Sequence, residues 1–199
     1  MLTWEEVAQV VADVTAGRVA RTLPVARHAE AFPGSEAPVI VAGADALEPR
    51  QLSWGFTLPD TGKLVFNTRL ESAAGSPFWG EAFKQRRCIV PAWEFCETHR
   101  TQMAIGETGR PVRQAYRFTR DDGACMLMAG VWQDNRFSVI TTEPDDAVSP
   151  VHDRMPLLLS SSRALDWVAG AEPGQDETAL LKAAVYPTAQ DAGEQLGLF

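Results

Sequence analysis

The stretch CIVPAWEFC, residues 88–96, decides the fold class because it is apolar and is interrupted only by Pro91. Such a run predicts a strand that is either buried or placed at the edge of a sheet, where a proline is tolerated. Further strands are predicted on both sides of it, at 33–40, 51–56, 63–67, 116–118, 124–131 and 136–142. The sequence DDG at 121–123 is typical of a hairpin turn between two of these strands.

Helices are predicted at both ends of this strand-rich region. Residues 3–16 place valines at helical spacing behind a capping box formed by Thr3 and Glu6. Three further helices are expected, at 76–87, 160–169 and 177–184. Many strands and few helices predict an α+β fold: a single domain with a strongly curved, mainly antiparallel, barrel-like sheet and peripheral helices.

Composition limits the class of protein. A chain of 199 residues with 45% hydrophobic content buries one full-sized core, so we expect one domain over residues 1–186 and a tail over 187–199. No apolar run reaches a membrane-spanning length, and no signal peptide is recognisable, so the expected location is the cytoplasm. Three cysteines without a C-x-x-C pair indicate neither disulfides nor a zinc site. We expect a monomer without metal or cofactor.

The formal net charge of -8 and the pI near 4.9 argue against indiscriminate coating of nucleic acid, because phosphate affinity comes mainly from Lys and Arg. Any contact with DNA would use a local patch. One candidate is the group Lys84, Arg86 and Arg87, which lies in an otherwise acidic chain. The same group is equally typical of a solvated basic face.

Four short motifs occur in order along the chain: WGF at 54–56, NTRLES at 67–72, RRCIVPA at 86–92 leading to Glu97, and VHDRMP at 151–156. Together they resemble the SRAP (SOS response-associated peptidase) family. Pro33 with Gly34 also resembles the family's turn before its first long strand, although Glu30 stands where the family has an asparagine.

The resemblance implies capture of abasic sites in single-stranded DNA. In the family, an N-terminal cysteine reacts with the aldehyde of the ring-opened sugar and closes a thiazolidine, which needs a proton shuttle and a polar group for the sugar hydroxyl. By resemblance, Asn67 positions the sugar or the reacting terminus, Glu97 acts as acid and base, and His152 protonates the opening sugar oxygen. The expected DNA contacts are Pro33, Trp54, Arg69, Arg86, Arg87 and Arg154, of which Arg69 and Arg154 hold flanking phosphates.

The residues themselves leave simpler interpretations open. Asn67 is also typical of a turn cap, and Arg69 of a strand-end ion pair with Glu71. Trp54 offers a stacking surface, supports the groove or is plain core. Most single histidines are not catalytic, although the charged neighbours of His152 indicate a polar loop.

The thiols do not replace the family's cysteine. Strand alternation puts Glu97 and Cys96 on opposite faces of the strand, so we expect that they do not both point into one site. Cys88 and Cys125 lie in apolar strands. All three thiols are interpreted as inert core groups.

The amino end departs from the family, since the chain begins Met1-Leu2-Thr3 instead of methionine followed by cysteine. Three interpretations stay open. In the first, the true start lies a few residues upstream. In the second, the α-amino group of Met1, of a type with a pKa near ~8, forms a Schiff base with the aldehyde and gives reversible capture or strand cleavage. In the third, the site is inactive and the protein only binds DNA.

The chain ends QLGLF at 195–199, which closely resembles the peptide that docks bacterial proteins on the replicative sliding clamp. The expected clamp contacts are Gln195, Leu196, Leu198 and Phe199. The alternative is a tail that folds back on its own core.

Three hypotheses for function follow. The first is an SRAP-like protein of the DNA damage (SOS) response that recognises abasic sites in single-stranded DNA, by a stable adduct or a transient Schiff base. The second is a catalytically inactive DNA-binding or sliding-clamp adaptor module. The third is a thiol-independent peptidase that processes its own amino end.

Overall fold

The structure is a computed structural model that describes residues 2–16, 30–171 and 181–186. Its helices are α1 (Trp4–Thr15), α2 (Leu70–Ala73), α3 (Gly80–Gln85) and α4 (Ser161–Val168). Its strands are β1 (Glu36–Ala42), β2 (Leu47–Trp54), β3 (Phe56–Thr57), β4 (Leu64–Val65), β5 (Asn67–Arg69), β6 (Arg87–Ala92), β7 (Glu94–Ile105), β8 (Pro111–Arg120), β9 (Met126–Gln133), β10 (Arg136–Thr142), β11 (Met155–Pro156), β12 (Leu158–Leu159) and β13 (Leu181–Val185).

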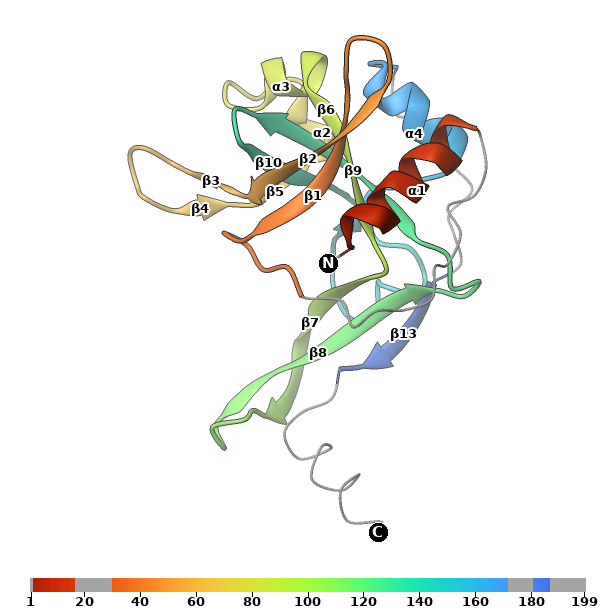
Figure 1. Ribbon diagram of the computed structural model, residues 1–199. Helices are drawn as coiled ribbons and strands as arrows, with labels where there is room; N and C mark the ends of the chain where they lie inside the picture. The colour runs from red at the N-terminus through yellow and green to blue at the C-terminus, as the bar shows by residue number, and fades with distance from the viewer. Residues whose placement is uncertain (1, 17–29, 172–180, 187–199) are drawn as a thin grey trace.

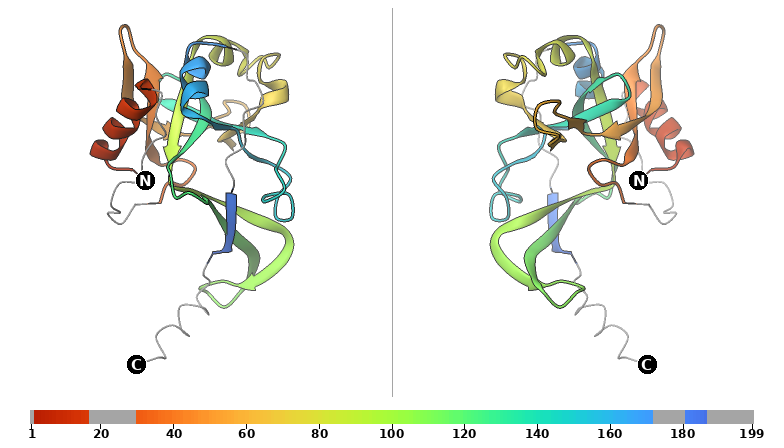
Figure 2. Two further views of the ribbon diagram at one scale, coloured as in Figure 1. Left: turned by 90° about the vertical axis from the view of Figure 1, so that its right-hand side faces the viewer. Right: turned by 90° about the vertical axis from the view of Figure 1, so that its left-hand side faces the viewer.

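Five strands form a closed ring in the order β10, β2, β1, β6 and β9, because β9 also pairs with β10 (Figure 1). Neighbours in the ring are antiparallel except that β10 runs parallel to β2. Strands β5 and β11 pair with β10, and β12 pairs with β9. The helices lie on the outside of the ring (Figure 2). The predicted α+β fold, with a barrel-like and mainly antiparallel sheet, is therefore confirmed.

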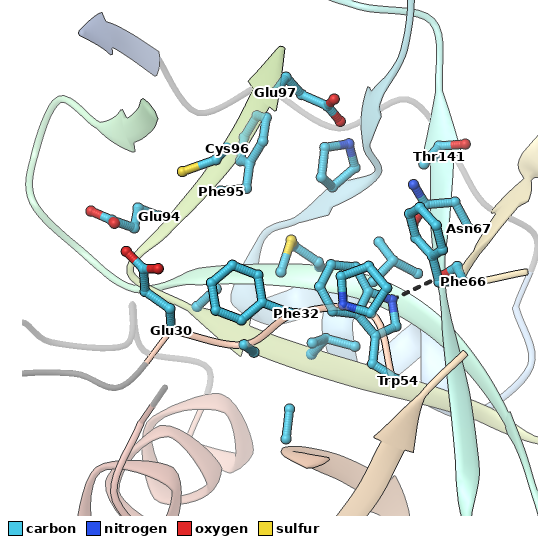
Figure 3. Close-up of a pocket in the computed structure, with 18 of the residues that line it drawn as sticks. Glu30, Phe32, Trp54, Phe66, Asn67, Glu94, Phe95, Cys96, Glu97 and Thr141 are labelled. Atoms are coloured by element: carbon cyan, nitrogen blue, oxygen red, sulfur yellow. Dashed lines mark hydrogen bonds between the residues drawn. The ribbon is translucent and has the colours of Figure 1, made fainter. Parts of the chain in front are cut away.

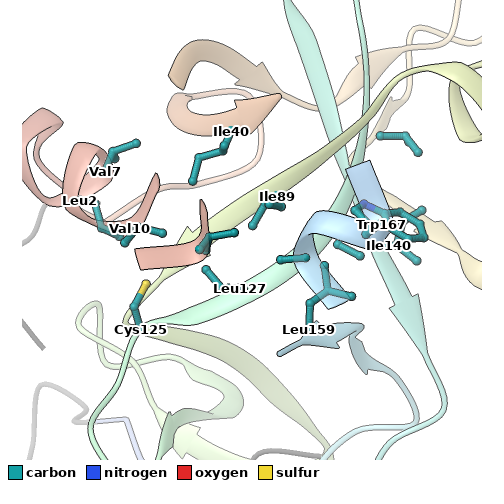
Figure 4. Close-up of a cluster of buried hydrophobic side chains, with 14 of the residues drawn as sticks. Leu2, Val7, Val10, Ile40, Ile89, Cys125, Leu127, Ile140, Leu159 and Trp167 are labelled. Carbon is teal, nitrogen blue, oxygen red and sulfur yellow. The ribbon is translucent and has the colours of Figure 1, made fainter. Parts of the chain in front are cut away.

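Four of the ring strands, β1, β6, β9 and β10, bury both faces over most of their length, which explains their nearly continuous apolar sequences, whereas β2 is mostly exposed. In β1, Val39 and Val41 belong to one hydrophobic cluster and Ile40 belongs to another. The cluster around Ile40 is closed by α1 and α4 and includes Trp167 (Figure 4). The other cluster lies on the opposite face of the sheet, where Ala37 and its neighbours line a cavity.

The run at 88–96 forms two strands in different sheets, so the single strand predicted there was wrong. Strand β6 ends at Ala92, and after Trp93 the chain enters a second sheet with the order β13, β8, β7. Pro91 lies inside β6, opposite Leu127 of β9. Strand β1 pairs with β6 only near the start of β6. Pro91 therefore lies where β6 has a single neighbour, and its missing N–H is tolerated there.

The hairpin predicted around 121–123 was also wrong. A turn is present, since Gly123 donates its N–H to the carbonyl of Arg120. The flanking strands do not pair, however, because β8 joins β7 and β13 whereas β9 joins the ring. The tight hairpin of the ring connects β9 to β10, where Asp134 adopts a φ of 55°.

The last predicted helix, at 177–184, is a strand where the structure describes it. Residues 181–184 belong to β13, which pairs antiparallel with β8. The edge of β8 offers these residues a ladder of hydrogen bonds, and tertiary pairing overrides a weak helical preference. Residues 177–180 lie outside the described residues.

The other helix ends follow their sequence signals. The Thr3 N–H donates to the Glu6 carboxylate (2.6 Å), and Thr3 Oγ1 accepts from the Glu6 N–H (3.3 Å), which is the predicted capping box. Ser160 caps α4 as expected. The helix predicted at 76–87 starts later, because Ser76 Oγ accepts two backbone N–H bonds in a preceding turn. Within the described ranges, no helix is long and apolar enough to cross a membrane.

Gly130 of β9 marks a tight point of the ring. A Cβ on Gly130 would lie 2.8 Å from Cys88 Sγ and 3.2 Å from Ser138 O. We expect Gly130→Ala to overpack the ring and to lower the free energy of unfolding in urea by about 1–3 kcal/mol. Gly75→Ala is the matched control, because nothing lies within 4 Å of its added Cβ. Equal unfolding midpoints for both variants would contradict this packing.

Candidate functional site

A cavity of about 890 Å³ opens where the chain leaves the ring after β6 and enters β7 (Figure 3). It is lined by strands of both sheets and by the segments 30–33 and 152–156. Seven residues predicted to form the site line it: Pro33, Trp54, Asn67, Arg69, Glu97, His152 and Arg154. The fold therefore brings together residues that are widely separated in the sequence.

Glu97 and His152 form a carboxylate–imidazole pair in this cavity. Glu97 Oε2 lies 3.6 Å from His152 Nδ1, and the two side chains are only 21% and 29% exposed. Burial raises the pKa of Glu97 because it penalises the charged carboxylate; a positive charge on His152 opposes the rise, and Asp153 adds to it. The Glu97 carboxyl keeps its proton to a higher pH than it would in water. Such a pair is suited to proton transfer at a bound reactant.

The loop that carries His152 is held against β7. Backbone N–H groups of Ala147 and Val148 donate to the Asp145 carboxylate, which fixes the turn after β10. The backbone N–H of Arg100 donates to the carbonyl of Val151, at 3.1 Å. Because Arg100 and Glu97 belong to the same strand, this contact fixes the imidazole loop relative to the carboxylate.

Asn67 is positioned by its own strand and by Trp54. Strand β5 runs parallel to β10 with Asn67 opposite Val139. Trp54 Nε1–H donates to the carbonyl of Phe66 (2.9 Å), and its ring stacks on Phe137 with centroids 6.3 Å apart. Trp54 is therefore a partly buried support of the cavity wall that fixes the residue just before Asn67.

The two cavity arginines differ in their partners. Arg154 makes a bidentate ion pair with Glu71, at 3.0 and 2.9 Å, and donates to the carbonyl of Thr141 at 2.6 Å. The hydrogen bond from Arg154 lowers the pKa of Glu71. Glu71 thus pairs with Arg154 and not with Arg69, the partner considered from the sequence. Arg69 is exposed, and within the described part of the chain its side chain makes no hydrogen bond or ion pair.

Arg86 and Arg87 do not line the cavity, and both side chains bind other groups of the protein. Arg87 is 6% exposed and donates to the carbonyl of Phe83 (2.7 Å). Its guanidinium also lies over the rings of Phe83 and Trp167. Arg86 pairs with Glu81 at 3.0 Å. A buried guanidinium bonded to backbone carbonyls cannot reach a phosphate, so Arg87 does not have the exposed position that a DNA contact needs. Arg86 lies outside the cavity lining, and its contact with DNA stays a prediction.

Comparison with known proteins identifies the family. A family model described as SOS response associated peptidase (SRAP) matches residues 2–193. The chain belongs to the SRAP family. It is 27% identical to the abasic site processing protein YoaM of Bacillus subtilis over 132 residues, which cover 59% of this chain and 55% of YoaM. It is 25% identical to the abasic site processing protein YoqW of Bacillus phage SPbeta over 132 residues, 59% of this chain and 56% of YoqW. This SRAP chain thus spans little more than half the length of the curated relatives it matches.

Solved structures share the fold. A protein from Bordetella bronchiseptica is 22% identical with a TM-score of 0.62, covering 80% of this chain and 90% of that chain. A protein from Bacteroides thetaiotaomicron is 21% identical with a TM-score of 0.61, covering 80% and 77%. A phage-related protein from Bordetella bronchiseptica is 25% identical with a TM-score of 0.59, covering 77% and 79%.

The thiols of this SRAP chain are only partly as expected. Cys88 and Cys125 are buried, and burial raises the pKa of both. Cys96 is exposed and lines the cavity, so it is not a core thiol. The sulfur of Cys96 is partly shielded from solvent, and this desolvation, together with the nearby carboxylates, Glu94 first, raises the pKa of Cys96 to about 11, which keeps the thiol protonated at neutral pH.

Cys96 and Glu97 point to opposite sides of β7, as alternation predicted (Figure 3). Both nevertheless line the cavity, so the expectation that only one of them would reach the site was wrong. The reason is that the cavity extends along both faces of β7 at its start. Among the described residues, no three His, Cys, Asp or Glu side chains are arranged to hold a metal ion.

Sequence reasoning missed several cavity residues. Phe32 and Leu2 both line it, the first largely exposed and the second buried. The Tyr186 hydroxyl donates to Glu30, and this hydrogen bond raises the pKa of Tyr186 to about 12. The only available signal for Phe32 was an aromatic residue beside the turn that begins at Pro33. Met1 and the peptide at 195–199 lie outside the described residues.

Glu97→Gln tests the burial of the carboxyl. Because the pKa of Glu97 is raised in the folded state, its stabilising protonated form is fully present below the ordinary pKa of 4.5 and is lost as pH rises through the raised value. We expect the stability of the variant relative to wild type, measured by urea unfolding, to improve as pH rises through that interval. Glu107→Gln, at an exposed turn residue, is the control and should show no such trend. A difference for Glu97→Gln that is independent of pH would disprove the raised pKa.

Proposed function

We propose that this SRAP protein recognises abasic sites in single-stranded DNA and processes them in the cavity of Glu97, His152 and Asn67. The observation that carries the proposal is the Glu97–His152 pair, 3.6 Å apart, in the same cavity as Asn67. The relatives YoaM and YoqW are named abasic site processing proteins, which supports the same substrate.

The proposed chemistry is imine formation. The amine of Met1 adds to the C1′ aldehyde of the ring-opened sugar, and the carbinolamine loses water to form a C=N bond. Protonated Glu97 gives a proton to the departing hydroxyl, and the resulting carboxylate takes the remaining proton from nitrogen. His152 protonates the ring oxygen as the sugar opens, and Asn67 holds a sugar hydroxyl. Leu2 lines the cavity, which supports an approach of its neighbour Met1.

The fate of the imine follows from the groups at hand. A thiazolidine needs a thiol on the carbon chain of the reacting amine. The thiol of Cys96 is on a different residue from the reacting amine and is protonated, so it cannot close that ring. An imine that no such thiol closes either hydrolyses or loses a proton from C2′ and expels the 3′ phosphate by β-elimination. Capture by such an imine is transient, in contrast to a durable thiazolidine adduct.

The preference for a single strand is argued from access and charge. A sugar that enters a cavity lined from two sheets must leave the helical stack, and this costs least where no partner strand holds it. Arg69 and Arg154 lie beside Asn67 and can hold a flanking phosphate. The net charge of -8 makes binding depend on this local arrangement.

Reductive trapping tests the proposal. We expect wild-type protein, mixed with a single-stranded oligonucleotide containing one abasic site and sodium cyanoborohydride, to give a cross-linked band in a denaturing gel. Asn67→Ala, Glu97→Gln and His152→Ala should each slow its formation, the acid–base variants by about 10²-fold or more. Glu107→Gln should leave the rate unchanged.

The controls separate the rival functions. A strand with all its bases, or one with a tetrahydrofuran analogue that has no aldehyde, should give no band. Selective binding of the abasic strand without any trapped product would instead support the inactive adaptor, and cleavage of an added amino-terminal extension would support a self-processing peptidase.

The peptide QLGLF at 195–199 supports a second, separate proposal, docking on the bacterial sliding clamp. We expect deletion of residues 195–199 to abolish binding to purified clamp in a pull-down while leaving the rate of reductive trapping unchanged. Clamp binding by the truncated protein would refute the docking role of this peptide.

A further inference from the structure

Phe32 is the most exposed large apolar side chain among the described residues, with 60% of its surface open, and it lines the cavity. A single exposed aromatic residue on a surface needs no explanation. The position of Phe32 does need an explanation. Its ring faces the cavity, between Trp54 on one side and the carboxylates of Glu30 and Glu94 on the other (Figure 3). Within the described residues, the ring of Phe32 is paired with no other aromatic ring.

The backbone holds Phe32 rigidly. Its N–H donates to Ser35 Oγ (3.0 Å), and its carbonyl accepts from both the hydroxyl and the N–H of Ser35 (2.8 and 2.9 Å). The turn is anchored to β2, since Trp54 accepts from the N–H of Gly34 and donates its own N–H to Ser35. Gly34 has a φ of 96°, which favours glycine and fixes the direction of the turn. Little backbone conformational entropy is therefore lost when a flat ligand binds to the ring.

The two ends of the cavity differ in the charged residues that line them. Arg69 lies opposite Thr141 in the pairing of β5 with β10, at the end where Asn67 lies. Glu30 and Glu94 lie at the other end, beside Phe32, where Glu94 pairs with Arg117 at 3.6 Å and Glu30 accepts a hydrogen bond from the Tyr186 hydroxyl. A phosphate is repelled from that end, whereas a nucleobase is neutral, stacks on an aromatic face and has amino groups that carboxylates accept.

We propose that Phe32 is a stacking platform for the nucleobase next to the abasic sugar. The cavity then binds the base of one flanking nucleotide at the Phe32 end and a phosphate at the Arg69 end. The inference rests on the proposed function and adds a specificity subsite to it. A baseless sugar offers nothing to stack on, so the neighbouring base is the nearest flat surface of the substrate. The platform contributes to binding and takes no part in proton transfer.

Equilibrium binding tests the platform without chemistry. The probe is a fluorescein-labelled single strand with one tetrahydrofuran abasic analogue, and the readout is fluorescence anisotropy. We expect Phe32→Ala to weaken binding about five- to a hundredfold, and Phe32→Trp to bind like wild type, because base–aromatic stacking contributes about 1–3 kcal/mol per base. Phe78→Ala is the matched control, an aromatic residue that is 41% exposed and outside the cavity lining, and it should bind like wild type.

A double-mutant cycle identifies the partner of the ring. Two further strands replace the base on the 5′ side or on the 3′ side of the analogue by a second analogue. For one of these strands, wild type should lose as much affinity, relative to the original strand, as the Phe32→Ala substitution costs on the original strand. Phe32→Ala should bind that strand as it binds the original one. Full affinity of Phe32→Ala, or equal further losses by both proteins on both strands, overturns the platform. If wild type instead fails to prefer the abasic strand over an intact strand, the proposed function itself fails, which is a different outcome.

Discussion

Pairing of β9 with β10 is the constraint on which the cavity depends. It closes the ring, and each of its two strands leads to part of the site. Strand β10 carries β5 with Asn67 along one edge and continues into the loop of His152. Strand β9 pairs with β6, whose continuation after Trp93 is the strand that carries Glu97. An amide, an imidazole and a carboxylate from three distant segments therefore line one cavity, because this hairpin joins β10 and β6 in one closed sheet and the segments of His152 and Glu97 continue from these strands.

Local signals predicted the elements better than their partners. The capping box of Thr3 and Glu6 and the bounds of β10, 136–142, follow from patterns within a few residues. The partners of β8 could not be predicted in this way. A turn at 121–123 ends one strand and starts another whether or not the two strands pair, and pairing depends on which edges the rest of the chain leaves open. The same reason turned 181–184, predicted as helix, into a strand.

The candidate site was predictable as a set of motifs but not residue by residue. Asn67, Glu97 and His152 came from the family motifs, and the cavity contains all three. Arg87 belongs to an equally recognisable motif, yet its guanidinium lies between Phe83 and Trp167. Phe83 is only four residues away, but Trp167 reaches Arg87 only in the folded chain, so the sequence alone does not indicate a buried guanidinium. Family motifs mix residues that react with residues that support, and only packing separates the two.

The bidentate bond between Glu71 and Arg154 affects how the protein responds to ionic strength. Counterions condense on a nucleic-acid strand and are released when free cations of a protein neutralise its phosphates, so under the proposed function a guanidinium already paired with a carboxylate would release few of them. Arg69 remains the cavity cation that can displace sodium from a phosphate. Affinity built mainly on shape, stacking and an internal hydrogen-bonding pocket declines gently as salt concentration increases. Under the proposed function, such an acidic protein would search for rare lesions without being held by the excess of undamaged, negatively charged strand around them.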